Sequence, residues 1–157
     1  MLVISVAGDY ESRALFERNV ISEFADGQGQ TTAYFTVVGR QPQLNRTVLE
    51  TTILSRKFDA VLLTRLKGQE QAELIANRPV GQLFDLFGYD YAELNTPASI
   101  EQAPAITFVT ELYSTADQKK VWSIESLSFD QATATDLINE QAATVAAQLR
   151  KDDLLAR

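Results

Sequence analysis

Three carboxylates stand among aromatic side chains in one short stretch, "LFDLFGYDYAEL" (residues 83–94). Asp85, Asp90 and Glu93 could perform acid–base chemistry if their surroundings gave them different pKa values. They could also bind a hard cation, although their spacing does not match the ligand pattern of an EF-hand loop. Solvated acidic side chains are the simpler interpretation, so the sequence predicts no metal site and no catalytic pair here.

A second group of residues could bind an anion. Gly8 closes the apolar run "LVISVAG" (2–8), and Asp9 stands where a helix begins. Free backbone N–H groups at a helix start favour anions, and Ser12 and Arg13 could add donors. A single glycine is neither a dinucleotide-binding motif nor a P-loop, and a tight turn with Arg13 paired to a carboxylate explains the same residues. Anion binding at Gly8, Asp9, Ser12 and Arg13 is therefore the alternative function.

The composition excludes several classes of chemistry. The chain has no Cys and no His, which removes thiol nucleophiles, imidazole bases, Ser-His-Asp triads and Cys/His zinc sites. Its formal charge of −7 argues against nucleic-acid binding, which needs a basic face. We therefore expect a protein that is not an enzyme and that uses no cofactor.

The length of 157 residues predicts a single domain. No run approaches the ~18–20 apolar residues of a transmembrane segment. Met1 leads directly into the first apolar run, so no signal peptide is visible. The protein is expected to be cytoplasmic if Met1 is the native start, and a leader has been removed if it is not.

The first half of the chain alternates strands and helices. Apolar runs predict strands at 2–8, 31–38 and 58–66, closed by glycines or turn residues. Apolar stripes predict a helix after Asp9 and another after Asn45; the stripe residues are Phe16, Val20, Phe24, Leu44, Val48, Leu49 and Ile53. Right-handed crossovers then give three parallel strands with the first in the middle.

The second half ends in a hairpin and a helix. Strands are predicted at 105–113 and 120–129, and the short polar turn between them requires an antiparallel pair. Ile138, Ala142, Val145 and Leu149 form the apolar stripe of a final helix, with Thr135 as its cap. The predicted fold is α/β, with a single mixed sheet (βαβαβ followed by a ββ hairpin), strand order 2-1-3-4-5, and helices packed on the sheet.

An aromatic and acidic insertion at residues 69–104 separates the third and fourth strands. Insertions of this length tend to be functional or disordered. Gly88 allows the backbone to turn, so we expect Phe84 and Phe87 to anchor the segment while Tyr89 and Tyr91 contact a partner. Asp85, Asp90 and Glu93 are expected to form an acidic rim. If the Leu and Phe side chains instead fold back onto the hairpin, the segment is simply core.

Several motifs together resemble an uncharacterised group of bacterial envelope lipoproteins. They are "ESRALFE" (11–17), "FDAVLLTRL" (58–66), the Tyr-bearing segment, "ELYSTADQKKVWSIES" (111–126) and "LRKDDLL" (149–155). The globular part of these lipoproteins is similar in plan to the amino-terminal domain of TolB and to lipoprotein activators of cell-wall synthases. The resemblance implies a periplasmic domain, tethered by a lipidated Cys on a segment not present here, that binds other envelope proteins and has no catalytic residue.

Overall fold

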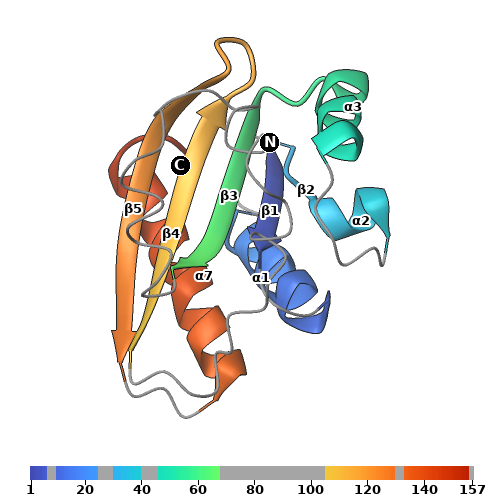
Figure 1. Ribbon diagram of the computed structural model, residues 1–157. Helices are drawn as coiled ribbons and strands as arrows, with labels where there is room; N and C mark the ends of the chain where they lie inside the picture. Colours follow the sequence, from blue (N-terminus) through green and yellow to red (C-terminus); the bar gives the residue numbers. More distant parts are fainter. Residues whose placement is uncertain (7–9, 25–29, 40–45, 68–104, 130–132, 156–157) are drawn as a thin grey trace.

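The computed structural model describes residues 1–6, 10–24, 30–39, 46–67, 105–129 and 133–155. Five strands form one mixed sheet with helices on both faces (Figure 1). The strands are β1 (Leu2–Val6), β2 (Thr32–Ala33), β3 (Ala60–Lys67), β4 (Ala105–Ser114) and β5 (Lys119–Phe129). The helices within the described residues are α1 (Tyr10–Glu23), α2 (Tyr34–Val38), α3 (Arg46–Arg56) and α7 (Ala134–Lys151).

The strand order is β2-β1-β3-β4-β5, which confirms the predicted topology. β1 pairs in parallel with both β2 and β3. β4 pairs antiparallel with β3 and with β5, so the last two strands form the expected hairpin. Because α1 and α3 lie between successive parallel strands in the sequence, the crossovers place helices on the sheet faces.

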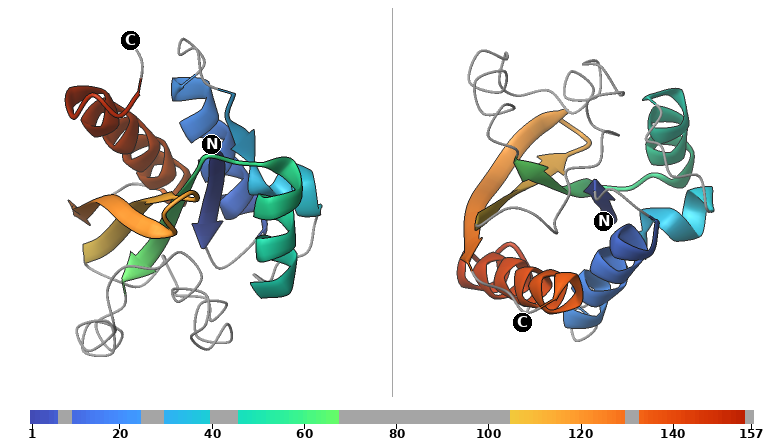
Figure 2. Two further views of the ribbon diagram at one scale, coloured as in Figure 1. Left: turned by 90° about the horizontal axis from the view of Figure 1, so that it is seen from above. Right: turned by 60° about the horizontal axis from the view of Figure 1, so that its bottom comes forward.

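Two apolar clusters hold the helices to the two faces of the sheet. On one face, α1 and α7 pack on the central strands, with Val3 and Leu62 beneath Phe16, Val20 and the apolar stripe of α7. On the other face, α2 and α3 pack over β1 and β3 through Tyr34, Leu49 and Ile53. Figure 2 shows α1 and α7 together on one side of the sheet and α3 on the opposite side. The alternation of side chains along each strand assigns neighbouring residues to different clusters.

The predicted strand at 31–38 is wrong over most of its length. Only Thr32 and Ala33 pair with β1, and Tyr34–Val38 form the short helix α2. The β-branched and aromatic composition favoured a strand. Tertiary contacts override that preference, because the Tyr34 side chain is buried in the core and a carboxylate from α1 binds the first turn of α2.

The cap of the last helix was also predicted at the wrong threonine. Thr133 is the N-cap of α7, and its Oγ1 accepts a hydrogen bond from the Asp136 N–H at 3.1 Å. Thr135 lies inside the first turn instead. The predicted stripe of α7 is confirmed, since its four apolar residues are buried. Leu44, Asn45 and the insertion at 69–104 lie outside the described residues.

Candidate functional site

Most residues predicted to contact a partner or an anion lie outside the part of the chain that the structure describes. These are Tyr89, Tyr91, Phe84, Phe87, Asp85, Asp90 and Glu93 of the insertion, with Gly8 and Asp9 before α1. Their roles stay predictions. The side chains that can be placed form three groups, on α1, across β3–β4–β5 and along β5.

The two described residues of the anion prediction lie on the first turn of α1. Ser12 is half-buried, and Arg13 is buried. Arg13 lies one turn before Glu17, and its positive charge lowers the pKa values of Glu17 and Tyr34. Arg13 is therefore close enough to the Glu17 carboxylate to favour its charged form, and the predicted pairing of Arg13 stays a prediction.

Glu17 links three elements from a fully enclosed position, with only 1% of its surface exposed. One carboxylate oxygen accepts the Ser5 N–H of β1 at 3.0 Å, and the other accepts the Phe35 N–H of α2 at 2.9 Å. Ala33, the N-cap of α2, has no side chain that could bind this N–H. Glu17 therefore supplies the cap of α2 from a neighbouring helix.

Burial decides the protonation of Glu17. Loss of solvent raises its pKa to about 7, although the backbone donors Phe35 and Ser5, the Arg13 charge and the Tyr34 backbone lower it. A carboxyl group that titrates near neutral pH could act as an acid or base in an open site. Here both oxygens accept backbone hydrogen bonds, so the geometry gives Glu17 a structural role.

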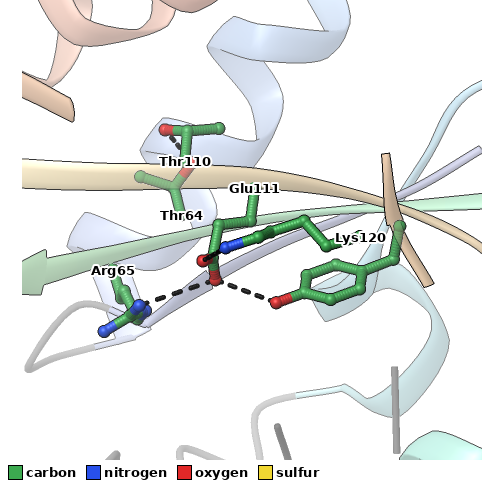
Figure 3. A network of polar contacts seen from close by, with 6 residues as sticks. Thr64, Arg65, Thr110, Glu111 and Lys120 are labelled. Atoms are coloured by element: carbon green, nitrogen blue, oxygen red, sulfur yellow. Dashed lines mark hydrogen bonds and ion pairs between the residues drawn. The ribbon is translucent and has the colours of Figure 1, made fainter. Parts of the chain in front are cut away.

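A second buried carboxylate, Glu111, organises a polar network on the sheet (Figure 3). One oxygen accepts the Tyr113 O–H at 3.0 Å and lies 3.6 Å from the Arg65 guanidinium. The other accepts the Lys120 ammonium at 3.0 Å. The four side chains come from β3, β4 and β5, so the network fastens the hairpin to the parallel half of the sheet.

Within this network, Arg65 and Lys120 compensate the negative charge of the buried Glu111 carboxylate. Glu111 is buried and Arg65 is nine-tenths enclosed, while the Lys120 side chain is more open. Burial and the Glu111 carboxylate raise the pKa of Tyr113, which keeps its hydroxyl protonated as a donor. On the opposite face, Thr64 and Thr110 share a buried hydrogen bond of 2.9 Å between their hydroxyl oxygens.

The most exposed feature of the sheet is its last strand. Among the described residues β5 pairs with β4 alone, which makes it the last strand of the sheet in that part of the chain. Val121, Ser123, Glu125 and Leu127 alternate with less exposed neighbours, and we name these four residues the β5 rim. Val121 is 55% exposed and Leu127 is 54% exposed.

Glu17, Glu111 and the β5 rim were not predicted from the sequence. Arg13 and Glu17 stand at helical spacing with Val20 of the predicted apolar stripe, and this spacing was the available signal that the two charged side chains are buried. Glu111 stands in an otherwise apolar strand segment, and its position likewise indicated burial. Val121 and Leu127 carried no signal, because an isolated apolar residue on a strand is expected to face the core.

Within the described ranges, no group of His, Cys, Asp and Glu side chains could hold a metal ion. None of the helices described here combines the length and apolar character that a membrane crossing requires.

Comparison with known proteins gives a likeness of fold only. No family model and no curated protein matches the sequence. A PelC dodecamer from Paraburkholderia phytofirmans is similar in structure, with a TM-score of 0.49 and 11% identity over 99% of this chain and 87% of that chain. A variant PelC dodecamer from the same organism gives a TM-score of 0.47 and 9% identity over 94% and 87% of the two chains. At this level of similarity the likeness assigns no role to any residue, and the resemblance to envelope lipoproteins stays a prediction.

Proposed function

We propose that this chain is a non-enzymatic domain of the bacterial envelope that works through contacts with other protein molecules. Its periplasmic position and its tether, a lipid on a preceding segment, follow from the resemblance of its motifs to envelope lipoproteins. The contact function has separate support from the side chains that the fold exposes.

The observation that carries the proposal is the β5 rim. Val121 and Leu127 are each more than half exposed, and they lie on a strand whose outer edge has no strand neighbour among the described residues. Such an edge can bind an added strand through backbone hydrogen bonds, which supply affinity, while the alternate side chains along the strand supply specificity. Val121 and Leu127 lie about 20 Å apart along the strand, so the proposed contact surface is the length of β5 between them and not a continuous apolar patch.

The buried charges support the same conclusion. The Glu17 carboxylate is bound by backbone N–H groups, and Glu111 is bound by Tyr113, Lys120 and Arg65. Both carboxylates therefore stabilise the fold. Neither carboxylate has an unbound oxygen that could exchange a proton with a substrate. These two buried groups therefore favour a structural role over a catalytic one.

We include the segment 83–94 as a second contact surface, on composition alone. Phe84 and Phe87 are proposed to anchor it, and Tyr89 and Tyr91 to meet the partner beside Asp85, Asp90 and Glu93. Tyr suits this role because it brings a large contact area and a hydrogen-bonding tip at low entropic cost.

Co-isolation from the envelope of the native bacterium tests the proposal. The double variant Val121→Lys, Leu127→Lys should fold normally, because both side chains are exposed, and should recover fewer bound protein molecules than the natural chain. Leu54→Lys is the matched control, since Leu54 is an exposed apolar residue on α3. Equal recovery by all three proteins would remove the β5 rim from the proposal.

The segment 83–94 is tested by the same assay. A Tyr89→Ala, Tyr91→Ala double variant should keep its melting temperature and lose partners, whereas Phe87→Ala should lower the melting temperature. If the double variant is destabilised as much as Phe87→Ala and recovers the same partners, the segment is core and not a contact surface.

A further inference from the structure

We propose that Arg65 binds a small carboxylate ligand on the face of the sheet where α2 and α3 pack. The site uses none of the side chains of the β5 rim, so it goes beyond the proposed function. Three observations support it: the place of Arg65 in the sheet, the hydrogen bonds around its guanidinium, and the charge of the group to which it belongs.

Arg65 lies at the carboxyl end of the parallel strands. It is two residues from the end of β3 (Ala60–Lys67), opposite Val6, the last residue of β1. The chain runs from β1 outward to β2 and then returns past β1 to β3, so the strand order reverses beside this pair. Open α/β sheets bind their ligands outside the carboxyl ends of the strands, at such a reversal.

Apolar neighbours surround the Arg65 side chain. Val6 of β1 and Val109 of β4 stand directly opposite it, and opposite residues share a face of the sheet. Leu63, two residues earlier, belongs to the apolar cluster beneath α2 and α3, which assigns Arg65 to that face. Only 10% of the Arg65 side chain is exposed. A guanidinium so enclosed has lost most of its water and needs hydrogen-bond acceptors in exchange.

Glu111 does not supply those acceptors. Its two oxygens accept the Tyr113 O–H and the Lys120 ammonium, each at 3.0 Å. The Arg65 Nη2 lies 3.6 Å from the nearer oxygen, which is an ion pair (Figure 3) but longer than a hydrogen bond. The Arg65 Nε is buried and has no hydrogen-bond partner in the described part of the chain. A ligand carboxylate could accept from Nε and a neighbouring guanidinium nitrogen together.

The charge of the network indicates the class of anion. Arg65 and Lys120 share the single carboxylate of Glu111, which leaves one positive charge in excess. Lys120 has the shorter contact and a side chain that is 27% exposed, whereas Arg65 has the longer contact and less water. One carboxylate would bring the sum of charges to zero. A phosphate carries more than one negative charge near neutral pH and would leave an excess among apolar neighbours. The narrow exposure of Arg65 limits the ligand to a small molecule.

Nuclear magnetic resonance of the ¹⁵N-labelled full chain tests the site with acetate as the probe. The Arg65 Nε–H signal is assigned by its loss in Arg65→Lys, and sodium acetate then replaces sodium chloride at constant pH and ionic strength. The Arg65 signal should shift and saturate. The Arg150 Nε–H signal is the internal control and should change little, because the Arg150 guanidinium donates to the Glu23 carbonyl oxygen and its side chain is 39% exposed. Phosphate should bind several-fold more weakly than acetate.

Variants separate the charge of the site from its geometry. Lys120→Met removes the excess charge but keeps the Arg65 signal, so the dissociation constant of acetate should rise several-fold. Acetate at about ten times its dissociation constant should raise the melting temperature of the natural chain by on the order of 4 °C. Arg65→Lys keeps the charge but lacks the planar array of donors, and should lose this rise. Arg150→Lys is the matched control and should keep it.

Three results would overturn the inference. They are the absence of a saturable shift of the Arg65 signal, equal shifts of the Arg65 and Arg150 signals, and an equal rise in melting temperature for the natural chain and Arg65→Lys. Phosphate binding as tight as acetate binding would contradict a carboxylate as the ligand. The co-isolation result expected for Val121 and Leu127 depends on none of these outcomes, so the ligand site and the contact function can fail separately.

Discussion

Glu17 of helix α1 accepts the backbone N–H of Phe35, at 2.9 Å, in the first turn of helix α2. The two residues are 18 positions apart in the sequence. Together with the burial of Tyr34, this contact favours a helix in a β-prone segment. The carboxylate accepts the Phe35 N–H, which in a longer β2 would need an acceptor on a neighbouring strand.

The protonation of Glu17 makes the stability of the fold depend on pH. Burial raises the pKa of Glu17 to about 7, whereas in the unfolded chain the group titrates near its usual value of about 4.3. Between these values the folded state holds a proton that the unfolded state has lost. The free energy of unfolding should therefore fall as pH rises from about 5 to 8, by on the order of 3 kcal/mol.

Urea denaturation of the natural chain and of Glu17→Gln at a series of pH values measures this effect. The difference between the two proteins isolates Glu17, because other titrating groups, such as the amino terminus, are present in both. The natural chain should show the fall and the variant should lack it. Parallel pH profiles would mean that Glu17 does not titrate in this window.

Removal of the Glu111 carboxylate should be costly because it leaves buried cations behind. Glu111→Gln should lower the free energy of unfolding by about 3–5 kcal/mol, since Arg65 then lacks its counter-charge. Lys120→Met should cost about 1 kcal/mol or less, because Lys120 is the more exposed partner.

A second variant separates charge from packing in this network. The double change Arg65→Met, Glu111→Met removes both buried charges and should be more stable than Glu111→Gln, because paired burial of ions is often no better than apolar packing. Chemical denaturation of the three variants decides the matter. A double variant less stable than Glu111→Gln would mean that the network stabilises by geometry and not by charge balance.

Leu62 tests the prediction of a strand covered on both faces. It is 0% exposed beneath α1 and α7, whereas Leu54 on α3 is 68% exposed. Leu62→Ala should cost about 2–5 kcal/mol through lost burial and the cavity left behind. Leu54→Ala is the same chemical change at the surface and should cost within about 0.5 kcal/mol of nothing. Equal losses of unfolding free energy in Leu62→Ala and Leu54→Ala, measured by thermal and urea denaturation, would contradict the assignment of Leu62 to the core.

Trp122 reports on the end of α7. Its indole N–H donates to Asp152 at 2.7 Å, and the hydrogen bonds from Trp122 and Gln148 lower the pKa of that carboxyl group. Because the chain has one Trp, its fluorescence should change as Asp152 is protonated, with a midpoint below the usual Asp value of about 3.9.

Asp152→Asn should abolish this acid transition, and Asp153→Asn, a neighbouring change at an exposed residue, should keep it. Far-UV circular dichroism over the same pH range shows that the fold persists through the transition. An identical transition in both variants would mean that Asp152 does not control the signal.

The sequence predicted the sheet because its signals are local. An apolar run closed by glycine identified β1, a run with an apolar middle identified β3, and the short polar turn at 114–119 required the antiparallel pair of β4 and β5. The length of β2 and the formation of α2 could not be predicted in this way. They depend on Glu17 and on the burial of Tyr34, which are contacts between distant parts of the chain.

The candidate site was less predictable for a related reason. The strand order predicted from the sequence already made β5 the last strand of the sheet, but no residue pattern indicated that Val121 and Leu127 are exposed on it. A buried Glu111 can be suspected from its apolar neighbours. Its partners Arg65 and Lys120 come from two other strands, so their convergence follows from sheet register.

Site-specific photo-crosslinking on β5 in the native bacterium tests the central claim most directly. A photoreactive residue at position 127 should yield a covalent adduct with another protein molecule, which includes a second copy of this chain. The same residue at position 144, exposed on α7, serves as the control and should yield none above background. If positions 127 and 144 give equal adducts or no adducts, β5 is not a contact surface and the account is contradicted.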